Sequence, residues 1–237
     1  MARRKDYNVR SAKRQIAPKL KRSENRYQPR LLVLLACEGK NTERLYFDAF
    51  FAILKERKTI SSASCVFAPH QHTNPTGVLN DLLNFKDSVG RTSNDYEHRW
   101  IVIDRDEERH GGGGHTLEDF NAAIERAAKC RRPVKVAWSN PSFELWYLLH
   151  FHFHNTAIDR DQVIDRLEKA MARAYDKSGN DMYSFLAGRT AEAVRNARRL
   201  IEQAVEVNGK LIPARANPAT TVYELVELLQ DLQETVE

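Results

Sequence analysis

The chain has 237 residues, of which 42% are hydrophobic and 29% are charged, a composition that can bury a core and excludes a wholly disordered protein. Its longest apolar run, from Leu31 to Cys37, is far too short to cross a membrane, and the first residues lack the apolar segment of a secretory signal. Three widely spaced cysteines argue against a disulfide framework or a zinc ribbon. We therefore expect a cytoplasmic protein.

The net charge of +5 is distributed unevenly along the chain. Residues 1–30 hold eleven Lys and Arg against two acidic residues, a charge of +9, so the other 207 residues sum to −4. A basic arm on a mildly acidic body is typical of a protein that contacts nucleic acid, although a solvated tail that only aids solubility is the alternative. The predicted nucleic-acid contacts in this arm are Arg3, Arg4, Lys5, Arg10, Lys13, Arg14, Lys19, Lys21 and Arg22.

Strands and helices are predicted to alternate through the first two thirds of the chain. Short apolar runs predict strands at residues 31–36, 64–68, 100–103 and 134–138. Apolar residues at a helical period fall between these runs, over residues 42–54, 78–85 and 117–128. This order predicts right-handed βαβ crossovers and a mostly parallel sheet, whose functional groups gather in the loops beyond the carboxyl ends of the strands.

The last third of the chain contains no convincing strand and offers helices near residues 161–175, 190–207 and 221–235. We therefore predict an α/β fold with a mostly parallel sheet flanked by helices and an appended α-helical C-terminal region. The predicted boundaries are a flexible basic arm at 1–29, an α/β domain at 30–155 and the helical region at 156–237. The glycines 111–114 lack the Lys-Ser/Thr ending of a phosphate-binding loop and are interpreted as a linker or lid.

Three carboxylates follow predicted strands at the same edge of the sheet. Glu38 comes after the first strand, and Asp104 and Asp106 come after the third. Clustered carboxylates repel one another unless a cation neutralises them, and such hard oxygen ligands suit Mg²⁺ or Mn²⁺. A metal held by few carboxylates keeps positions open for phosphate oxygens and water, as phosphodiester chemistry needs. The alternative is a solvated acidic loop.

The Glu-Gly after the first strand and the Asp-x-Asp after a later one resemble the Toprim fold of topoisomerases, primases and OLD-type nucleases. Longer strings resemble the RloB family, Toprim-like proteins of bacterial phage-defence loci, over roughly residues 30–230. These strings are Cys37 to Glu43 with Tyr46-Phe47, Asp104 to Glu107, Ser139 to Trp146 with Leu148 to Phe151, and Asn217 to Val222.

The resemblance implies that Glu38 corresponds to the Toprim glutamate, and Asp104 and Asp106 to its metal-binding aspartates. The resemblance also implies a partner ATPase encoded at the same locus. Nothing in this chain resembles a Walker A loop, so any ATP hydrolysis is expected to come from that partner. No attached domain with a nucleophilic tyrosine is visible, which favours hydrolysis by a metal-activated water over strand passage.

The string that begins at Asn140 is interpreted as a helix start. Asn140-Pro141 is expected to cap a buried helix over residues 143–151. Glu144 then lies near the acidic edge. Its carboxylate either interacts favourably with the helix dipole or belongs to the catalytic carboxylates, and we predict the second role. Lys40, Asn140 and His150 are supporting candidates. A zinc site on His150 and the two histidines that alternate with phenylalanines after it is disfavoured, because no further ligand cluster accompanies them.

The sequence thus predicts a Mg²⁺- or Mn²⁺-dependent nuclease in which Glu38 is a metal ligand or general base and Asp104 and Asp106 hold the metal. One alternative is a nucleic-acid-binding or assembly module that binds metal without turnover. Another is a metal-dependent enzyme acting on nucleotides or polyphosphate. Whether the substrate is DNA or RNA, including tRNA, stays open at this point.

Overall fold

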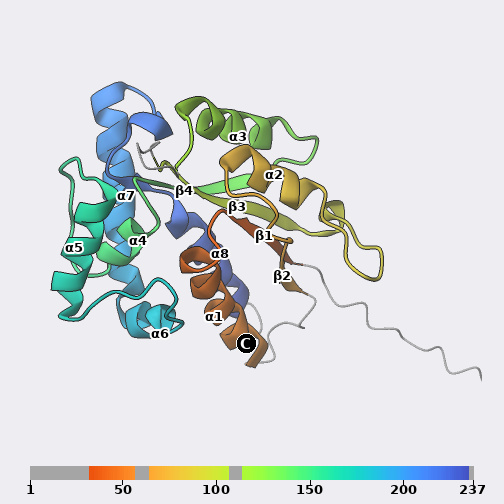
Figure 1. Ribbon diagram of the computed structural model, residues 1–237, viewed down its shortest axis with the longest axis horizontal. Coiled ribbons are helices and arrows are strands. Elements are labelled where there is room, and N and C mark those ends of the chain that lie inside the picture. The colour runs from red at the N-terminus through yellow and green to blue at the C-terminus, as the bar shows by residue number, and fades with distance from the viewer. Residues whose placement is uncertain (1–31, 57–63, 107–113, 235–237) are drawn as a thin grey trace, which may run out of the picture.

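The computed structural model describes residues 32–56, 64–106 and 114–234 (Figure 1). The basic arm and most of the glycine-rich loop lie outside the described residues, so the predictions made for them stay predictions. Five strands form one sheet in the order β2-β1-β3-β4-β5. Their bounds are Val33–Cys37 (β1), Cys65–Phe67 (β2), His98–Asp104 (β3), Lys135–Asn140 (β4) and Ala219–Thr220 (β5). The first four strands are parallel and β5 is antiparallel to β4, which confirms the predicted α/β fold with a mostly parallel sheet.

Helices connect the strands and fill the C-terminal third of the chain. Their bounds are Thr42–Glu56 (α1), Pro75–Leu83 (α2), Leu117–Lys129 (α3), Glu144–Leu148 (α4), Arg160–Met171 (α5), Met182–Leu186 (α6), Thr190–Asn208 (α7) and Val222–Glu234 (α8). Three short 3₁₀ segments are Ser93–Asp95 (η1), Ala187–Arg189 (η2) and Pro213–Arg215 (η3). Among the described residues, no helix is both long enough and apolar enough to cross a bilayer.

The central strands are buried because both faces of the sheet are covered. Along β1, Val33 and Leu35 point into one half of the core, and Leu34 and Ala36 point into the other, as the two-residue period of a strand requires. Strand β3 alternates in the same way. A run of apolar residues without polar interruption is the pattern expected for strands of this kind.

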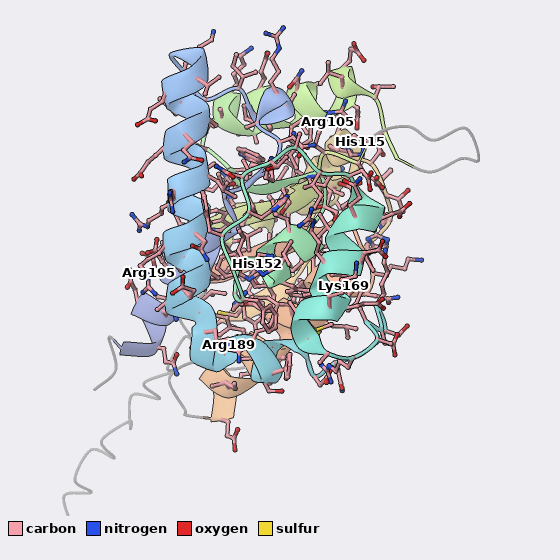
Figure 2. All side chains as sticks on the ribbon, turned by 90° about the vertical axis from the view of Figure 1, so that its left-hand side faces the viewer. Arg105, His115, His152, Lys169, Arg189 and Arg195 are labelled. Atoms are coloured by element: carbon pink, nitrogen blue, oxygen red, sulfur yellow. The ribbon has the colours of Figure 1, made fainter. Side chains whose placement is uncertain are left out.

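Two helical layers cover the sheet (Figure 1). Helices α2 and α3 pack on one face, and α1, α4 and α8 pack on the other with α5, α6 and α7 around them. Figure 2 shows α5 and α7 from the side, with Lys169 on α5 and Arg195 on α7. The C-terminal helices therefore share one apolar core with the parallel sheet, and the loops at the carboxyl ends of β1 and β3 stay accessible between the layers.

Two local predictions for this region are wrong. Asn140 does not cap a helix, because it is the last residue of β4 and pairs with Ala219 of β5, while its side-chain amide donates to the carbonyl oxygen of Pro213 at 3.2 Å. The helix begins at Glu144 instead, after a cis peptide bond between Asn140 and Pro141. The C-terminal region also contributes β5, whose two residues are too few to give a sequence pattern.

Candidate active site

A pocket of about 230 Å³ opens where β1 and β3 end, and we call it the acidic pocket. It brings together Glu38, Asp104 and Asp106, the three carboxylates that the sequence predicted at this edge. Parallel strands cause this convergence, because their carboxyl ends meet at one edge whatever their distance in sequence. The lining residues are Glu38, Gly39, Glu43, Thr73, Asp104, Asp106, Gly114 and Arg160.

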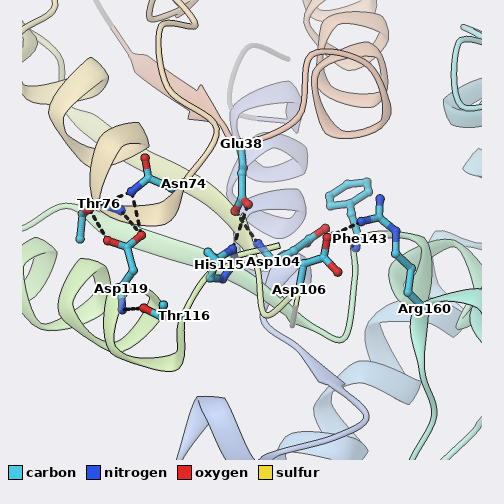
Figure 3. A network of polar contacts seen from close by, with 10 residues as sticks. All are labelled: Glu38, Asn74, Thr76, Asp104, Asp106, His115, Thr116, Asp119, Phe143 and Arg160. Atoms are coloured by element: carbon cyan, nitrogen blue, oxygen red, sulfur yellow. Dashed lines mark hydrogen bonds and ion pairs between the residues drawn. The ribbon is translucent and has the colours of Figure 1, made fainter. Parts of the chain in front are cut away.

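Glu38 is held by two partners at its carboxylate (Figure 3). Its Oε2 accepts a hydrogen bond from the backbone N–H of Asp104 at 3.1 Å, which joins the end of β1 to the end of β3. Its Oε1 lies 3.3 Å from Nδ1 of His115, a side chain that is almost fully buried and stacks on Phe120. Glu38 is thus held by a hydrogen bond to β3 and lies beside a buried histidine, as expected of a ligand or base whose position matters.

Asp104 is a buried carboxyl group of the acidic pocket with a raised pKa. Its side chain is 6% exposed, and its Oδ2 accepts a hydrogen bond from the backbone N–H of Phe143 at 3.1 Å. Its Oδ1 is buried and has no hydrogen-bond partner in the described part of the chain. Burial, together with the charges of Glu43, Glu38 and Glu144, raises the pKa of Asp104 well above its usual value. A cation beside Oδ1 would offset both effects.

Asp106 is paired with an arginine that sequence reasoning missed. Nη1 of Arg160 lies 2.6 Å from Oδ2 of Asp106 (Figure 3), and Nη2 lies 4.0 Å from Oε1 of Glu144. Arg160 is the first residue of α5, 54 positions after Asp106, and no motif in the sequence connects the two. Only the packing of α5 beside the sheet edge brings this guanidinium to the carboxylates.

Glu144 lies beside the acidic pocket, near the carboxylates predicted to be catalytic. It is the first residue of α4 and only 1% exposed. Its Oε1 accepts a hydrogen bond from the hydroxyl of Tyr175 at 3.4 Å and lies 3.5 Å from Nζ of Lys177. Its Oε2 is buried with no hydrogen-bond partner among the described residues. Because α4 has fewer than two turns, its dipole is a weak reason for burying a carboxylate.

A fifth carboxylate, Glu43, was not predicted as a site residue. It lies in the first turn of α1 and is 5% exposed. A Cβ atom on Gly39 would lie 2.1 Å from Oε2 of Glu43, so the glycine leaves room for this carboxylate. One sequence signal could have revealed it. Glu43 lies on the same face of the helix as Phe47, Phe50 and Leu54, and a charged residue on this apolar, buried face is unusual unless it has a functional role.

The protonation of Glu43 predicts how stability depends on pH. Burial, with the nearby charges of Glu144 and Glu38, raises its pKa to about 7. A carboxyl group whose pKa is raised on folding stabilises the protein below its unfolded pKa, and this contribution is lost as pH rises through the folded pKa. We therefore expect Glu43→Gln to change the free energy of unfolding little at pH 5 and to raise it at pH 8.5, by roughly 3 kcal/mol at most.

Urea denaturation at both pH values measures this difference, with Glu118→Gln as the control because Glu118 is exposed in the first turn of α3. Equal stability of Glu43→Gln and the unaltered protein at pH 8.5 would contradict the expected repulsion among the carboxylates.

The supporting residues suggested by the sequence are not brought to the acidic pocket. Lys40 is exposed in the loop after β1. His150 is buried in the core, with Nδ1 2.8 Å from the carbonyl oxygen of Trp146, and burial lowers its pKa to about 4. Asn140 lines a second pocket that adjoins the acidic one.

The oxygen donors fit a hard divalent cation, although the side chains do not provide a complete coordination sphere for it. In the described ranges, no three Asp, Glu, His or Cys side chains are grouped so that they could hold a metal ion. Mg²⁺ is commonly bound through only one or two carboxylates, with waters and substrate phosphates completing its coordination. Asp104 Oδ1 and Glu144 Oε2 are the two buried carboxylate oxygens that lack partners in the described chain. They are the oxygens best suited to such a cation.

Comparison with known proteins identifies the family of this chain. Searches against curated proteins and against solved structures return nothing similar. A family model described as RloB-like protein matches residues 33–229, a span that includes the five strands and every carboxylate of the acidic pocket. The chain therefore belongs to the RloB-like protein family.

Proposed function

We propose that this protein is a Toprim-type, Mg²⁺- or Mn²⁺-dependent nuclease that hydrolyses phosphodiester bonds. The observation that carries the proposal is the group of buried carboxylates at the carboxyl edge of the sheet, where Asp104 and Glu144 each have one oxygen without a partner among the described residues. Burying such charges is costly unless a cation or proton compensates them. Because the pocket is accessible, a cation bound by these carboxylates would offset this cost and could also contact a phosphate.

Each residue of the acidic pocket has a role in this proposal. Asp104 and Asp106 hold the metal, with Glu144 beside them. Glu38 lies at the pocket wall, held by the backbone N–H of Asp104 and close to His115, and is the candidate to ligate the metal or to take a proton from the attacking water. When bound, the metal polarises the phosphate and stabilises the leaving oxygen. Arg160 is the cation placed to contact a phosphate oxygen after releasing Asp106.

The nuclease proposal is tested by incubating the full chain with labelled single- and double-stranded DNA and RNA. Parallel reactions contain Mg²⁺, Mn²⁺ or EDTA. We expect cleavage in at least one metal and none in EDTA. Binding without cleavage in every metal would favour the alternative of a nucleic-acid-binding or assembly module.

The family also supports a proposal about context, namely that the protein acts in antiphage defence beside an ATPase encoded at the same locus. Repeating the reactions with the ATPase and ATP tests whether the partner controls cleavage. An ATPase that neither binds this chain nor alters its cleavage would contradict the partnership and leave the nuclease proposal in place.

The basic arm is expected to supply affinity without base specificity. Deleting residues 1–29, which hold most of the basic excess, should weaken nucleic-acid binding and reduce the slope of log K against log salt concentration. The melting temperature should not change, because the described core begins at Leu32. Fluorescence anisotropy over a series of salt concentrations measures the slope. An unaltered slope would show that the arm contacts something other than phosphate.

A further inference from the structure

A second, larger pocket shares a wall with the acidic pocket, and we call it the side pocket. Its volume is about 530 Å³, within the range of roughly 300–1,000 Å³ that is usual for small-molecule sites. Asp106 and Arg160 line both pockets. A ligand in the side pocket would therefore lie next to the carboxylates while remaining separate from them.

The floor of the side pocket is held rigid by hydrogen bonds. Oδ1 of Asn217 accepts from the backbone N–H of Ile158 at 3.1 Å, and its Nδ2 donates to the carbonyl oxygen of Ile158 at 3.0 Å. Asn140 is fixed in turn by the carbonyl oxygens of Pro213 and Ala214. The pocket thus exists before any ligand arrives, which lowers the cost of ordering its walls on binding.

The composition of the walls suits a flat ring joined to a phosphate. The apolar residues of its lining are Pro141, Ala157 and Ile158, of which Ala157 is exposed and the other two are largely buried. A ring placed against Ala157 would lose part of its contact with water. Arg105 lines the same pocket, and Figure 2 shows it near the end of α5 opposite to Lys169. Arg160 lies at the boundary between the two pockets, so an anion at this boundary has a guanidinium beside it.

We propose that the side pocket binds the nucleoside of the nucleotide whose phosphate lies at the acidic pocket. This inference rests on the proposed function, because it assigns a substrate-binding subsite to the same reaction. It identifies the ligand class as a nucleotide, with the ring against the apolar wall and the phosphate toward Arg160. The side pocket would position the substrate and take no part in bond cleavage.

The test measures equilibrium binding to the full chain without any turnover. AMP, CMP, GMP and UMP are titrated separately and followed by ligand-observed NMR, with inorganic phosphate as the probe for simple anion binding. We expect at least one nucleotide to bind roughly tenfold or more tightly than phosphate. Ala157→Phe should fill the side pocket and weaken this binding about tenfold, whereas Ala52→Phe, on the exposed surface of α1, should leave it unchanged.

A gain-of-binding variant avoids the ambiguity of a misfolded protein. Asp161 is exposed at the side pocket and its charge opposes a phosphate, so Asp161→Lys should tighten nucleotide binding about threefold. The matched control is Glu118→Lys, which makes the same charge change in the first turn of α3 away from both pockets. Nucleotide binding that is unaffected by Ala157→Phe and by Asp161→Lys would overturn the proposal.

The two proposals fail separately in these experiments. If the unaltered chain cleaves nucleic acid and Ala157→Phe still binds nucleotides normally, the nuclease proposal stands and the side-pocket proposal is refuted. If the unaltered chain does not cleave nucleic acid but binds nucleotides, and Ala157→Phe abolishes that binding, the nuclease proposal is refuted and the side pocket remains a nucleotide site. A chain that binds no nucleotide better than phosphate contradicts the side-pocket assignment outright.

Discussion

Asp104→Asn is expected to abolish metal-dependent cleavage, by about 10²-fold or more, as when a metal ligand is lost, while leaving the protein at least as stable as before. The stability follows from burial and carboxylate repulsion, which raise the pKa of Asp104 in the folded protein. An amide of the same shape can still accept from the backbone N–H of Phe143 and carries no charge. Cleavage assays and thermal melts at pH 8 measure the two effects together. Glu38→Gln and Asp106→Asn should likewise lose cleavage.

Asp119→Asn provides the matched control for this result. Burial alone would raise the pKa of Asp119, but hydrogen bonds from Thr76 and Asn74 outweigh it and lower the pKa. This carboxylate is thus satisfied as an anion (Figure 3), and its replacement should lower the melting temperature and spare cleavage. Full cleavage by both Asp104→Asn and Asp106→Asn would refute the assigned site.

Glu144→Gln is expected to reduce cleavage by a similar factor with little change in stability. The reason is the position of its carboxylate, which lies at the hydroxyl of Tyr175 and near Arg160 and has one oxygen without a partner in the described chain. If Glu144 served only the helix dipole, the same change would cost about 0.3–1 kcal/mol of stability and leave cleavage intact.

Lys177→Met distinguishes these roles further. It removes the ion pair with Glu144 but keeps the carboxylate, and since Lys177 is partly exposed the pair contributes little to stability. We expect this variant to retain most of its cleavage. Equal losses of cleavage in Glu144→Gln and Lys177→Met would show that the ion pair matters and not the carboxylate as such.

The sequence predicted the parts of the fold that depend on regular patterns. The continuous apolar run of β1 identified a strand buried on both faces, and the alternation with helices identified a parallel sheet. From that topology alone, Glu38, Asp104 and Asp106 could be assigned to one edge. Strand β5 was not predicted, because two residues are too few to show the alternating pattern of a strand.

The rest of the candidate site depends on tertiary packing that no local pattern encodes. Arg160 opens α5 and reaches Asp106 only because that helix packs beside the sheet edge. His115 is 77 positions after Glu38 in the sequence, and only the folded chain brings the two side chains together. Asn140-Pro141 was misleading because the same two residue types that begin helices also end a strand here.

The central claim is that the acidic pocket holds a divalent cation, and Mn²⁺ binding measured by electron paramagnetic resonance tests it most directly. Titrating Mn²⁺ into the full chain at pH 8 should give a bound population that is lost in Asp104→Asn and unchanged in Asp119→Asn. Nucleic acid added in metal-free buffer before the Mn²⁺ titration should increase the affinity of the protein for Mn²⁺, because phosphate oxygens complete the coordination. Mn²⁺ that binds Asp104→Asn and the unaltered chain equally well, or binds neither, would contradict the account.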